Sequence, residues 1–399
     1  MFNSNLMPAA LQPFAPVHTE APALPAFSTA ADAIAAYSGD DHIYALYPSK
    51  IKAAARRFVG RFPGRILFAV KSNPHPEMLK ILWEEGVDTF DVASIREMEL
   101  VSGLFPGAKM YLMHPIKSRA TIARAYSLGI RDFSFDHEDE LQKIYDCTGE
   151  AGDLNLHLRL SLPSGGAVMP LSGKFGAEFD AAVALLKSAR PRVKSLGICF
   201  HVGSQCLSPG AYDRAISYGR TIVDASGVDI DSVDIGGGFP VAYPDMPVRP
   251  MDEYFDAIRS SLIANEFGAV EIIGEPGRAL CAEGGATLAR IELRKGHDLY
   301  LNDGTYGSLF DAGQFAWKFP VTLHRRRPPA PSQFLTGFRF FGPTCDSADT
   351  MNGPFPLPSD ACEGDWIEIQ NLGAYGQTLA TQFNGFYSTH TVVITDETL

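Results

Sequence analysis

The sequence predicts an α/β protein: a (β/α)8 TIM-type barrel, followed by a mainly β C-terminal domain. Two observations carry this prediction. Between residues 66 and 274, eight short apolar or β-branched runs alternate with helix-like segments, as parallel strands joined by helical crossovers do. After about residue 284, β-rich runs separated by Gly and Pro replace the helical segments, which indicates a second domain.

Eight runs have the composition of buried strands. They are ILFAV (66–70), VDTFDV (87–92), KMYLM (109–113), DFSFD (132–136), LNLHLRL (154–160), LGICFHV (196–202), SVDIG (232–236) and VEIIG (270–274). Helical patterns cover 76–85, 95–104, 117–128, 137–147, 178–190, 211–226 and 252–266. An open doubly wound sheet is the alternative fold, but no GxGxxG motif follows the first run, which disfavours a dinucleotide-binding version.

Four segments are expected along the chain. Residues 1–30 are rich in Ala and Pro and predict a loosely ordered leader. Residues 31–48 contain the run HIYALYP and are expected to join the β domain as a strand. The barrel is expected over 49–284 and the β domain over 285–399, where ATLARIEL, HDLYLND, WIEIQN and STHTVVIT have strand composition.

The composition excludes some classes of binding partner and indicates the cellular compartment. The net charge of −12 disfavours nucleic acid and anionic membranes, and no apolar run reaches the length of a membrane span. The six cysteines form no CxxC motif, so neither a metal site nor a disulfide framework is predicted. The first 49 residues contain no Lys or Arg and so lack the positive start of a secretory signal. A cytoplasmic protein is expected.

Polar residues stand at the carboxyl ends of the eight predicted strands, where the chemistry of a parallel barrel gathers. They are Lys71, Asp91, His114, Asp136, Arg159, His201, Gly236–Gly238, and Glu275 with Arg278. Single members have structural explanations: His114 as a loop residue and Asp136 as a helix cap. Glu97 completes an S-x-x-E capping box with Ser94. The coincidence of all eight favours a functional site.

The last two strand ends predict a phosphate site. DIGGGFP offers three glycines whose backbone N–H groups can approach an anion, and GEPGR places an arginine directly after the last strand. Together with Lys71 for a Schiff base and Glu275 for a pyridine nitrogen, they fit pyridoxal 5'-phosphate. A Schiff-base aldolase acting on a sugar phosphate is the competing class, but it has no need of Glu275.

Nine motifs resemble those of the fold-type III pyridoxal-phosphate decarboxylases, and especially the ornithine decarboxylase branch. In chain order they are AVKSN, FDVAS, KFG, FHVGSQ, DIGGGFP, GEPGR, DGTYGS, GPTCD and GAYGQTLATQFNGF, spread over roughly residues 40–390. The resemblance implies an alanine-racemase-like barrel followed by a β domain. It also implies a decarboxylase acting on a basic amino acid, either L-ornithine to putrescine, a step of polyamine biosynthesis, or lysine to cadaverine.

The resemblance also implies roles for individual residues. Lys71 is expected as the Schiff-base lysine, Glu275 as the partner of the pyridine nitrogen, and His201 as a ring stacked on the cofactor. Asp91, Glu97 and Arg159 are expected to support the lysine and the ring. The expected phosphate ligands and their turn are Ser204, Gly236, Gly237, Gly238, Pro276, Gly277, Arg278 and Tyr375.

Cys345 resembles the cysteine that returns a proton to the α-carbon after carbon dioxide leaves. It follows the turn Gly342–Pro343–Thr344, which predicts that it is presented on a loop. Asp346 resembles an acid that recognises the substrate's distal amine. In the family both residues reach into the active site of a second subunit, so an obligate homodimer with shared sites is implied.

The substrate end departs from the ornithine enzymes. The family's second amine-binding aspartate aligns with Phe315, and Asp311, one helical turn earlier, is the candidate substitute. Tyr306 and Phe383 are also expected beside the substrate. Because an unpaired ammonium against Phe315 is unfavourable, a decarboxylase of another amino acid stays open.

Other members of the fold are also considered. A racemase would need a base opposite the lysine, usually a tyrosine, where this chain offers Cys345. The diaminopimelate branch is disfavoured because GPTCDSAD lacks its CESGD-like run. A non-catalytic relative would usually lose the lysine or the phosphate ligands, and both are present here.

Overall fold

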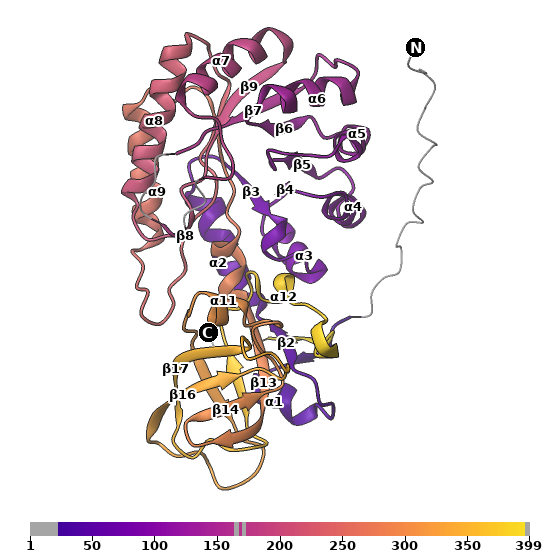
Figure 1. Ribbon diagram of the computed structural model, residues 1–399, viewed down its shortest axis with the longest axis vertical. Coiled ribbons are helices and arrows are strands. Elements are labelled where there is room, and N and C mark those ends of the chain that lie inside the picture. The colour runs from indigo at the N-terminus through magenta and orange to yellow at the C-terminus, as the bar shows by residue number, and fades with distance from the viewer. Residues whose placement is uncertain (1–22, 163–166, 170–172, 396–399) are drawn as a thin grey trace.

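The computed structural model describes residues 23–162, 167–169 and 173–395. Figure 1 shows a barrel with its helices at one end of the molecule and a β sheet at the other. Eight parallel strands close the barrel in the order β3-β4-β5-β6-β7-β9-β11-β12, and β12 pairs back to β3. The predicted fold class is therefore confirmed.

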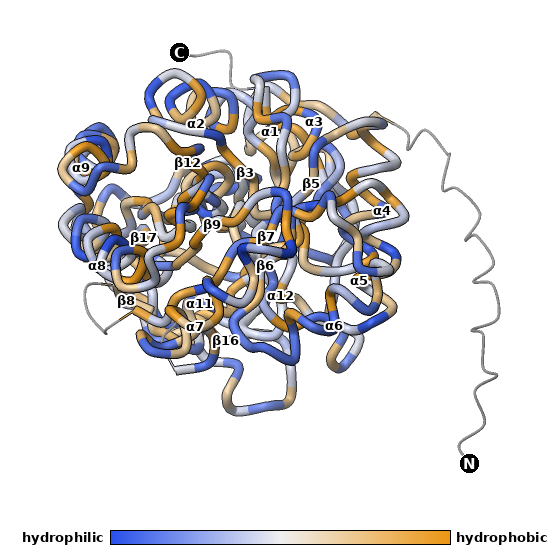
Figure 2. The backbone as a smooth tube through the Cα atoms, turned by 90° about the horizontal axis from the view of Figure 1, so that it is seen from above, coloured by the Kyte–Doolittle hydropathy of each residue, from blue (hydrophilic) through white to orange (hydrophobic). Residues whose placement is uncertain are grey.

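All eight predicted runs form barrel strands. They are β3 (Arg65–Ala69), β4 (Thr89–Asp91), β5 (Lys109–Leu112), β6 (Asp132–Phe135), β7 (Asn155–Arg159), β9 (Ser195–Cys199), β11 (Ser232–Asp234) and β12 (Glu271–Gly274). The surrounding helices are α2 (Pro48–Arg61), α3 (Pro76–Glu84), α4 (Ile95–Leu104), α5 (Arg119–Ser127), α6 (Glu138–Thr148), α7 (Phe179–Ala189), α8 (Gly210–Ser226) and α9 (Met251–Ala264). Figure 2 shows these helices as a ring around the strands.

The ring of helices explains the apolar composition of the strands. A strand covered on both faces has no solvent side, so β3 is buried from Ile66 to Ala69. Helix α2 buries Ile51, Ala55 and Phe58, which follow each other at helical spacing and face the barrel. This packing fixes where each strand ends and thereby positions the residues that follow it.

The second sheet has the strand order β1-β19-β2-β13-β14-β16-β17, and β18 pairs with both β13 and β15. Its strands are β1 (Ala26–Phe27), β2 (Ile43–Leu46), β13 (Gly285–Lys295), β14 (Asp298–Leu301), β15 (Val321–His324), β16 (Leu335–Phe341), β17 (Thr350–Pro358), β18 (Trp366–Ile369) and β19 (Thr391–Ile394). Strand β2 comes from the run HIYALYP and pairs antiparallel with β13 and parallel with β19.

The expectation of a loosely ordered leader is wrong for residues 26–30. Ala26 and Phe27 pair with Val393 and Ile394 of β19, and Ala30 begins helix α1 (Ala30–Ala36). Thr29 caps that helix by accepting the N–H of Asp32. Residues 1–22 of the predicted leader lie outside the described residues.

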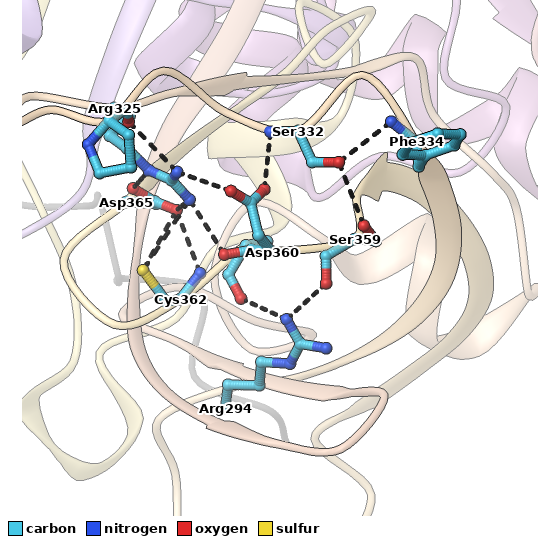
Figure 3. A network of polar contacts seen from close by, with 10 residues as sticks. Arg294, Arg325, Ser332, Phe334, Ser359, Asp360, Cys362 and Asp365 are labelled. Carbon is cyan, nitrogen blue, oxygen red and sulfur yellow. Dashed lines mark hydrogen bonds and ion pairs between the residues drawn. The ribbon is translucent and has the colours of Figure 1, made fainter.

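A polar network ties two loops of the β sheet together (Figure 3). Arg325 is nearly buried and binds the carboxylates of Asp360 and Asp365 at 2.9 and 2.8 Å. Arg294 donates to the carbonyl oxygens of Ser359 and Ala361. The network fixes the connection between β17 and β18 against the segment after β15, because a buried guanidinium needs its charge and its donors satisfied.

Short elements complete the chain. They are β8 (Ala167–Met169), β10 (Ser204–Cys206), α10 (Arg278–Cys281), α11 (Phe310–Gln314) and α12 (Gly376–Leu379). Within the described ranges, no helix is both long enough and apolar enough to cross a bilayer.

Candidate active site

A cavity of about 450 Å³ lies at the carboxyl ends of the barrel strands. Residues of β3, β4, β7 and β10 line it, together with residues of the loops after β5, β9, β11 and β12. Among the residues singled out from the sequence, its walls contain Lys71, Asp91, His114, Arg159, His201, Ser204, Gly238, Glu275, Gly277, Arg278 and Tyr375. Residues separated by some 300 positions in the chain therefore meet in one place.

Lys71 lies in a single 3-10 turn that ends β3, so its side chain leaves the strand towards the cavity. Its Nζ is 3.0 Å from Asp91 Oδ2, at the end of β4. The charge of Asp91, and more weakly that of Glu275, raises the pKa of Lys71 above its ordinary value, against the opposing effect of burial. Asp91 therefore holds the lysine as an ammonium group.

Glu97 is held next to this pair by the start of helix α4. Its carboxylate accepts the N–H of Ala93 at 2.6 Å, and Ser94 accepts the N–H of Glu97. Burial raises the pKa of Glu97. Its helix-capping contact, expected from the S-x-x-E motif, is confirmed.

Glu275 follows β12 and is only 5% exposed. Its backbone N–H donates to Gly236 O at 2.8 Å, which joins the ends of β11 and β12. Its carboxyl oxygen Oε1 is buried, and no N–H or hydroxyl donor reaches it within the described residues. Burial, followed by the nearby charges of Asp234 and Asp91, raises the pKa of Glu275 well above its ordinary value.

The three glycines after β11 make a turn that larger residues could not form. Gly236 has φ +69°, and a Cβ there would lie 2.1 Å from Phe200 O. Gly238 has φ +95°, and its Cβ would lie 2.4 Å from Gly203 O. A Cβ on Gly237 would meet Glu275 O at 2.5 Å. The backbone therefore comes close to neighbouring strands and exposes Gly238 at the cavity wall.

Arg278 is 5% exposed and begins helix α10. Both of its terminal nitrogens lie 3.3 Å from Asp311 Oδ2, and one also donates to the Tyr243 hydroxyl. Its Nε is buried with no acceptor among the described residues. The Tyr375 ring lies 5.0 Å from the Arg278 guanidinium, and the backbone N–H of Tyr375 donates to Ser72 O. Arg278 is thus anchored from one side and keeps a donor free.

His201 follows β9, and its Nδ1 accepts the N–H of Gly203 at 2.9 Å. Burial, followed by the charges of Arg159 and Lys71, lowers the pKa of His201 well below its ordinary value. The ring is therefore neutral at physiological pH. Arg159 and Ser204 line the same wall, at the ends of β7 and the start of β10.

Cys345 and Asp346 are exposed and do not line this cavity. The Cys345 N–H donates to Asn384 Oδ1 at 3.3 Å, and the Tyr306 hydroxyl donates to Asp346 Oδ2. The Tyr306 and Phe383 rings are 4.9 Å apart. The loop that carries the thiol is thus supported by other predicted residues, but outside the cavity of its own chain.

Asp311 and Phe315 also stand outside the cavity walls. Asp311 is 7% exposed and its carboxylate is engaged by Arg278, so it is not free to bind an amine as expected. The helical period predicted that Asp311 lies near Phe315, but it could not predict the contact of Asp311 with Arg278. Phe315 is 45% exposed, and its ring contacts Phe310.

Sequence reasoning missed several walls of the cavity. Lys174 and Phe175 line it, and the Phe175 ring lies 5.4 Å from His114. Gly176 N–H donates to Asp136 Oδ2, so a strand-end acid holds this loop. The KFG motif was the available signal. Within the described ranges, no group of three or more His, Cys, Asp or Glu residues is placed to hold a metal ion.

Comparison with known proteins agrees with this geometry. Residues 48–282 match the family described as pyridoxal-dependent decarboxylase, pyridoxal binding domain. The lysine/ornithine decarboxylase of Selenomonas ruminantium is 32% identical over 343 residues, which cover 83% of this chain and 84% of that enzyme. This chain belongs to the pyridoxal-dependent decarboxylases. It is an amino acid decarboxylase whose cofactor is pyridoxal 5'-phosphate.

Solved decarboxylases have the same fold. The lysine/ornithine decarboxylase of Vibrio vulnificus complexed with cadaverine superposes with a TM-score of 0.76 at 30% identity, over 91% of this chain and 96% of that one. The arginine decarboxylase of Paramecium bursaria Chlorella virus bound to agmatine gives a TM-score of 0.79 at 26% identity, over 91% and 98%.

The cavity of this decarboxylase fits pyridoxal phosphate on three structural grounds. Lys71 offers an amine for the aldehyde at one wall. Glu275 lines another wall and offers a buried carboxyl group that can accept a pyridine N–H. The turn, whose close contacts with neighbouring backbone admit only glycine, brings the Gly238 backbone to the cavity wall, and Arg278 on that wall has a buried Nε without an acceptor among the described residues.

Proposed function

We propose that this decarboxylase acts on a basic L-amino acid, with L-ornithine to putrescine as the first candidate and lysine to cadaverine as the second. The observation that carries the proposal is the meeting of Lys71, Glu275 and Arg278 in one cavity. The relatives named as lysine/ornithine and arginine decarboxylases support a basic substrate.

In this proposal Lys71 supplies the amine that reacts with the cofactor aldehyde, and Asp91 orients it. Arg278 binds the phosphate as a charged donor, together with Ser204, Gly236, Gly237, Gly238, Gly277 and Tyr375, while Pro276 shapes the turn. Arg159 supports the ring, and neutral His201 packs on its face. When bound, the cofactor supplies an electron sink for the pair left by departing carbon dioxide. Glu275 accepts the ring N–H and keeps that sink protonated.

The proton for the substrate's α-carbon comes from Cys345 in this proposal. Because Cys345 is exposed and absent from the cavity walls of its own chain, we propose a homodimer in which it reaches the partner's cavity. The exposed rings of Phe315, Phe383 and Phe386 support this, since apolar surface of this kind is typical of an interface.

Asp346 binds the distal amine of the substrate in this proposal. Tyr306 orients it through its hydroxyl, and Phe383 packs on Tyr306. Phe315 occupies the place of a second acid, so the far ammonium has one carboxylate partner instead of two. With one carboxylate instead of two at the distal ammonium, we expect the enzyme to discriminate less strongly between ornithine and lysine.

Two measurements test the proposal. Cofactor-free protein mixed with pyridoxal phosphate should gain a visible absorbance band that Lys71→Ala lacks, whereas Cys345→Ala should keep it. Carbon dioxide release is then compared for ornithine, lysine, arginine, diaminopimelate and neutral amino acids. Turnover of neutral amino acids alone would refute a basic substrate.

Mixed subunits test the shared site. Lys71→Ala and Cys345→Ala proteins are each expected to be inactive. Random exchange of their subunits should restore about a quarter of the wild-type activity, because half of the dimers are mixed and carry one intact site each. No recovery after exchange confirmed by mass would place Cys345 in its own subunit's site or outside catalysis.

We also infer a reducing compartment, in keeping with the cytoplasm. All six cysteines are free thiols in the structure, and two of them, Cys345 and Cys362, are exposed.

A further inference from the structure

A second carboxyl group lies directly behind Glu275, away from the cavity. Asp234 is the last residue of β11, has no exposed surface and is not part of the cavity wall. The two strands pair in parallel, with Asp234 opposite Ile273, so Asp234 and Glu275 extend from adjacent strand ends. Their carboxyl groups lie within hydrogen-bonding reach of each other.

A hydrogen bond between the two carboxyl groups requires a proton on one of them. Asp234 Oδ1 accepts the N–H of Gly236 at 2.8 Å. Its Oδ2 and Glu275 Oε1 are buried, and within the described residues no N–H or hydroxyl donor reaches either oxygen. Two ionised carboxylates cannot hydrogen-bond, and burying both charges in contact is strongly unfavourable. One proton between the two acids removes both problems.

The surroundings place limits on the charge of the pair. The titratable or charged groups that face it are Lys71 after β3, Asp91 on β4, Tyr111 on β5, His157 and Arg159 on β7, and Cys199 on β9, while Asp132 on β6 pairs with His157. Burial raises the pKa of Asp234 to about 6 and that of Glu275 well above its ordinary value. Lys71 is already paired with Asp91, and the charges of Lys71 and Arg159 lower the pKa of Glu275 by less than burial and the neighbouring acids raise it.

We propose that Asp234 is a positioning residue that shares a single proton with Glu275, so that the two acids together carry one negative charge. Without a ring N–H beside it, Glu275 holds the proton. When a ring N–H is donated to Glu275, this proton moves along the hydrogen bond to Asp234 Oδ2, and Glu275 keeps the charge next to the ring. No proton is gained or lost in that transfer. The inference rests on the proposed role of Glu275.

Asp234→Asn is the decisive variant because an asparagine imitates a protonated aspartic acid. Its oxygen can accept the Gly236 N–H while its amide donates to Glu275, and the total charge stays at one. We expect its dissociation constant for pyridoxal phosphate, measured by absorbance titration at pH 7, to stay within about threefold of wild type. Asp234→Ala removes the donor, and we expect its constant to rise by about tenfold or more.

A readout without cofactor tests the shared proton itself. An acid whose pKa is raised in the folded state holds its proton between its unfolded and folded pKa values, so stability falls as the pH rises through that window. The contribution of this pair to stability should therefore decrease between pH 4.5 and pH 7, whatever the contributions of other groups such as His201. The melting temperature of cofactor-free wild type minus that of Asp234→Asn should accordingly fall over this range. Asp132→Asn, a buried barrel aspartate outside the cavity, is the matched control.

The outcomes separate the two proposals. A loss of cofactor affinity in Asp234→Asn as large as in Asp234→Ala would overturn the single shared proton, since it would show that a second charge is needed. Equal pH dependence of melting in Asp234→Asn and wild type would overturn it as well. If Glu275→Gln binds the cofactor like wild type, the role of Glu275 fails, while the melting comparison still reports on the proton.

Discussion

Replacing Gly238 by alanine tests the phosphate turn directly. Its φ of +95° disfavours any L-residue, at a cost of about 1–2 kcal/mol. The new Cβ would also lie 2.4 Å from Gly203 O, about 1 Å short of ordinary contact. Because both groups are backbone, the turn must move, and an overpacked contact adds about 1–3 kcal/mol. The closed turn is therefore destabilised by about 2–5 kcal/mol.

This strain should appear mainly as lost cofactor affinity. The free protein can relieve it by opening the turn, whereas phosphate binding needs the turn closed. Binding must close the turn again, and if this costs about 2–3 kcal/mol, the dissociation constant for pyridoxal phosphate rises about 30- to 150-fold. Absorbance titration of cofactor-free protein measures it, and thermal melting reports any general destabilisation.

Two other glycines serve as controls for Gly238. Gly227 ends helix α8 with φ +62° and has no atom within 4 Å of its Cβ position, so Gly227→Ala has the backbone cost without the contact. Gly268 has neither. Affinity within threefold of wild type in Gly238→Ala would refute the reasoning. So would an equal loss in Gly227→Ala, since that would show a general effect of instability.

Three further predictions concern pH, substrate and stability. The lowered pKa of His201 means that unfolding allows the ring to take up a proton below pH 6.5, so stability should fall with decreasing pH by up to about 1.4 kcal/mol per unit. His201→Phe should flatten urea-unfolding stability between pH 6.5 and 5, and an unchanged slope would contradict the buried neutral ring. Phe315→Asp should raise kcat/KM for ornithine relative to a neutral analogue about tenfold, and an unchanged ratio would place Phe315 away from the substrate. Lys117 has a fully buried side chain 3.1 Å from Glu140, whose carboxylate also pairs with Lys143, so Lys117→Met should cost about 1–3 kcal/mol in urea unfolding. Adding Glu140→Leu should recover part of that loss, and no recovery would exclude the ion pair as its cause.

The barrel strands were predictable because their environment leaves a simple pattern. A strand between a ring of helices and a filled interior is apolar throughout, as Ile66 to Ala69 are, and a polar residue marks its end. Lys71, Asp91 and Glu275 were found in this way. The position of each in the cavity then follows from strand order alone, since all parallel strands end at the same face.

Other parts of the site leave no local pattern. Asp234 appears in the sequence as an ordinary member of the run SVDIG, and only the pairing of β11 with β12 puts it behind Glu275. Asp311 was assigned to the substrate because it lies one helical turn before Phe315. Helical spacing could not show that its carboxylate is bound by Arg278, 33 residues earlier in the chain. The strand at Ala26 escaped notice because it is two residues long and its partner β19 lies at the other end of the chain.

The distribution of charge in the cavity argues for what completes it. Each of the cations Lys71 and Arg278 already has its own carboxylate, Asp91 for the first and Asp311 for the second. Glu275 lines the cavity and, in our proposal, carries one negative charge together with Asp234. A positively charged group brought by a ligand would pair with that charge, whereas a neutral ligand would leave it unpaired. We therefore expect the two acids to favour the protonated form of the cofactor ring, which is the form that best accepts electrons from a substrate losing carbon dioxide.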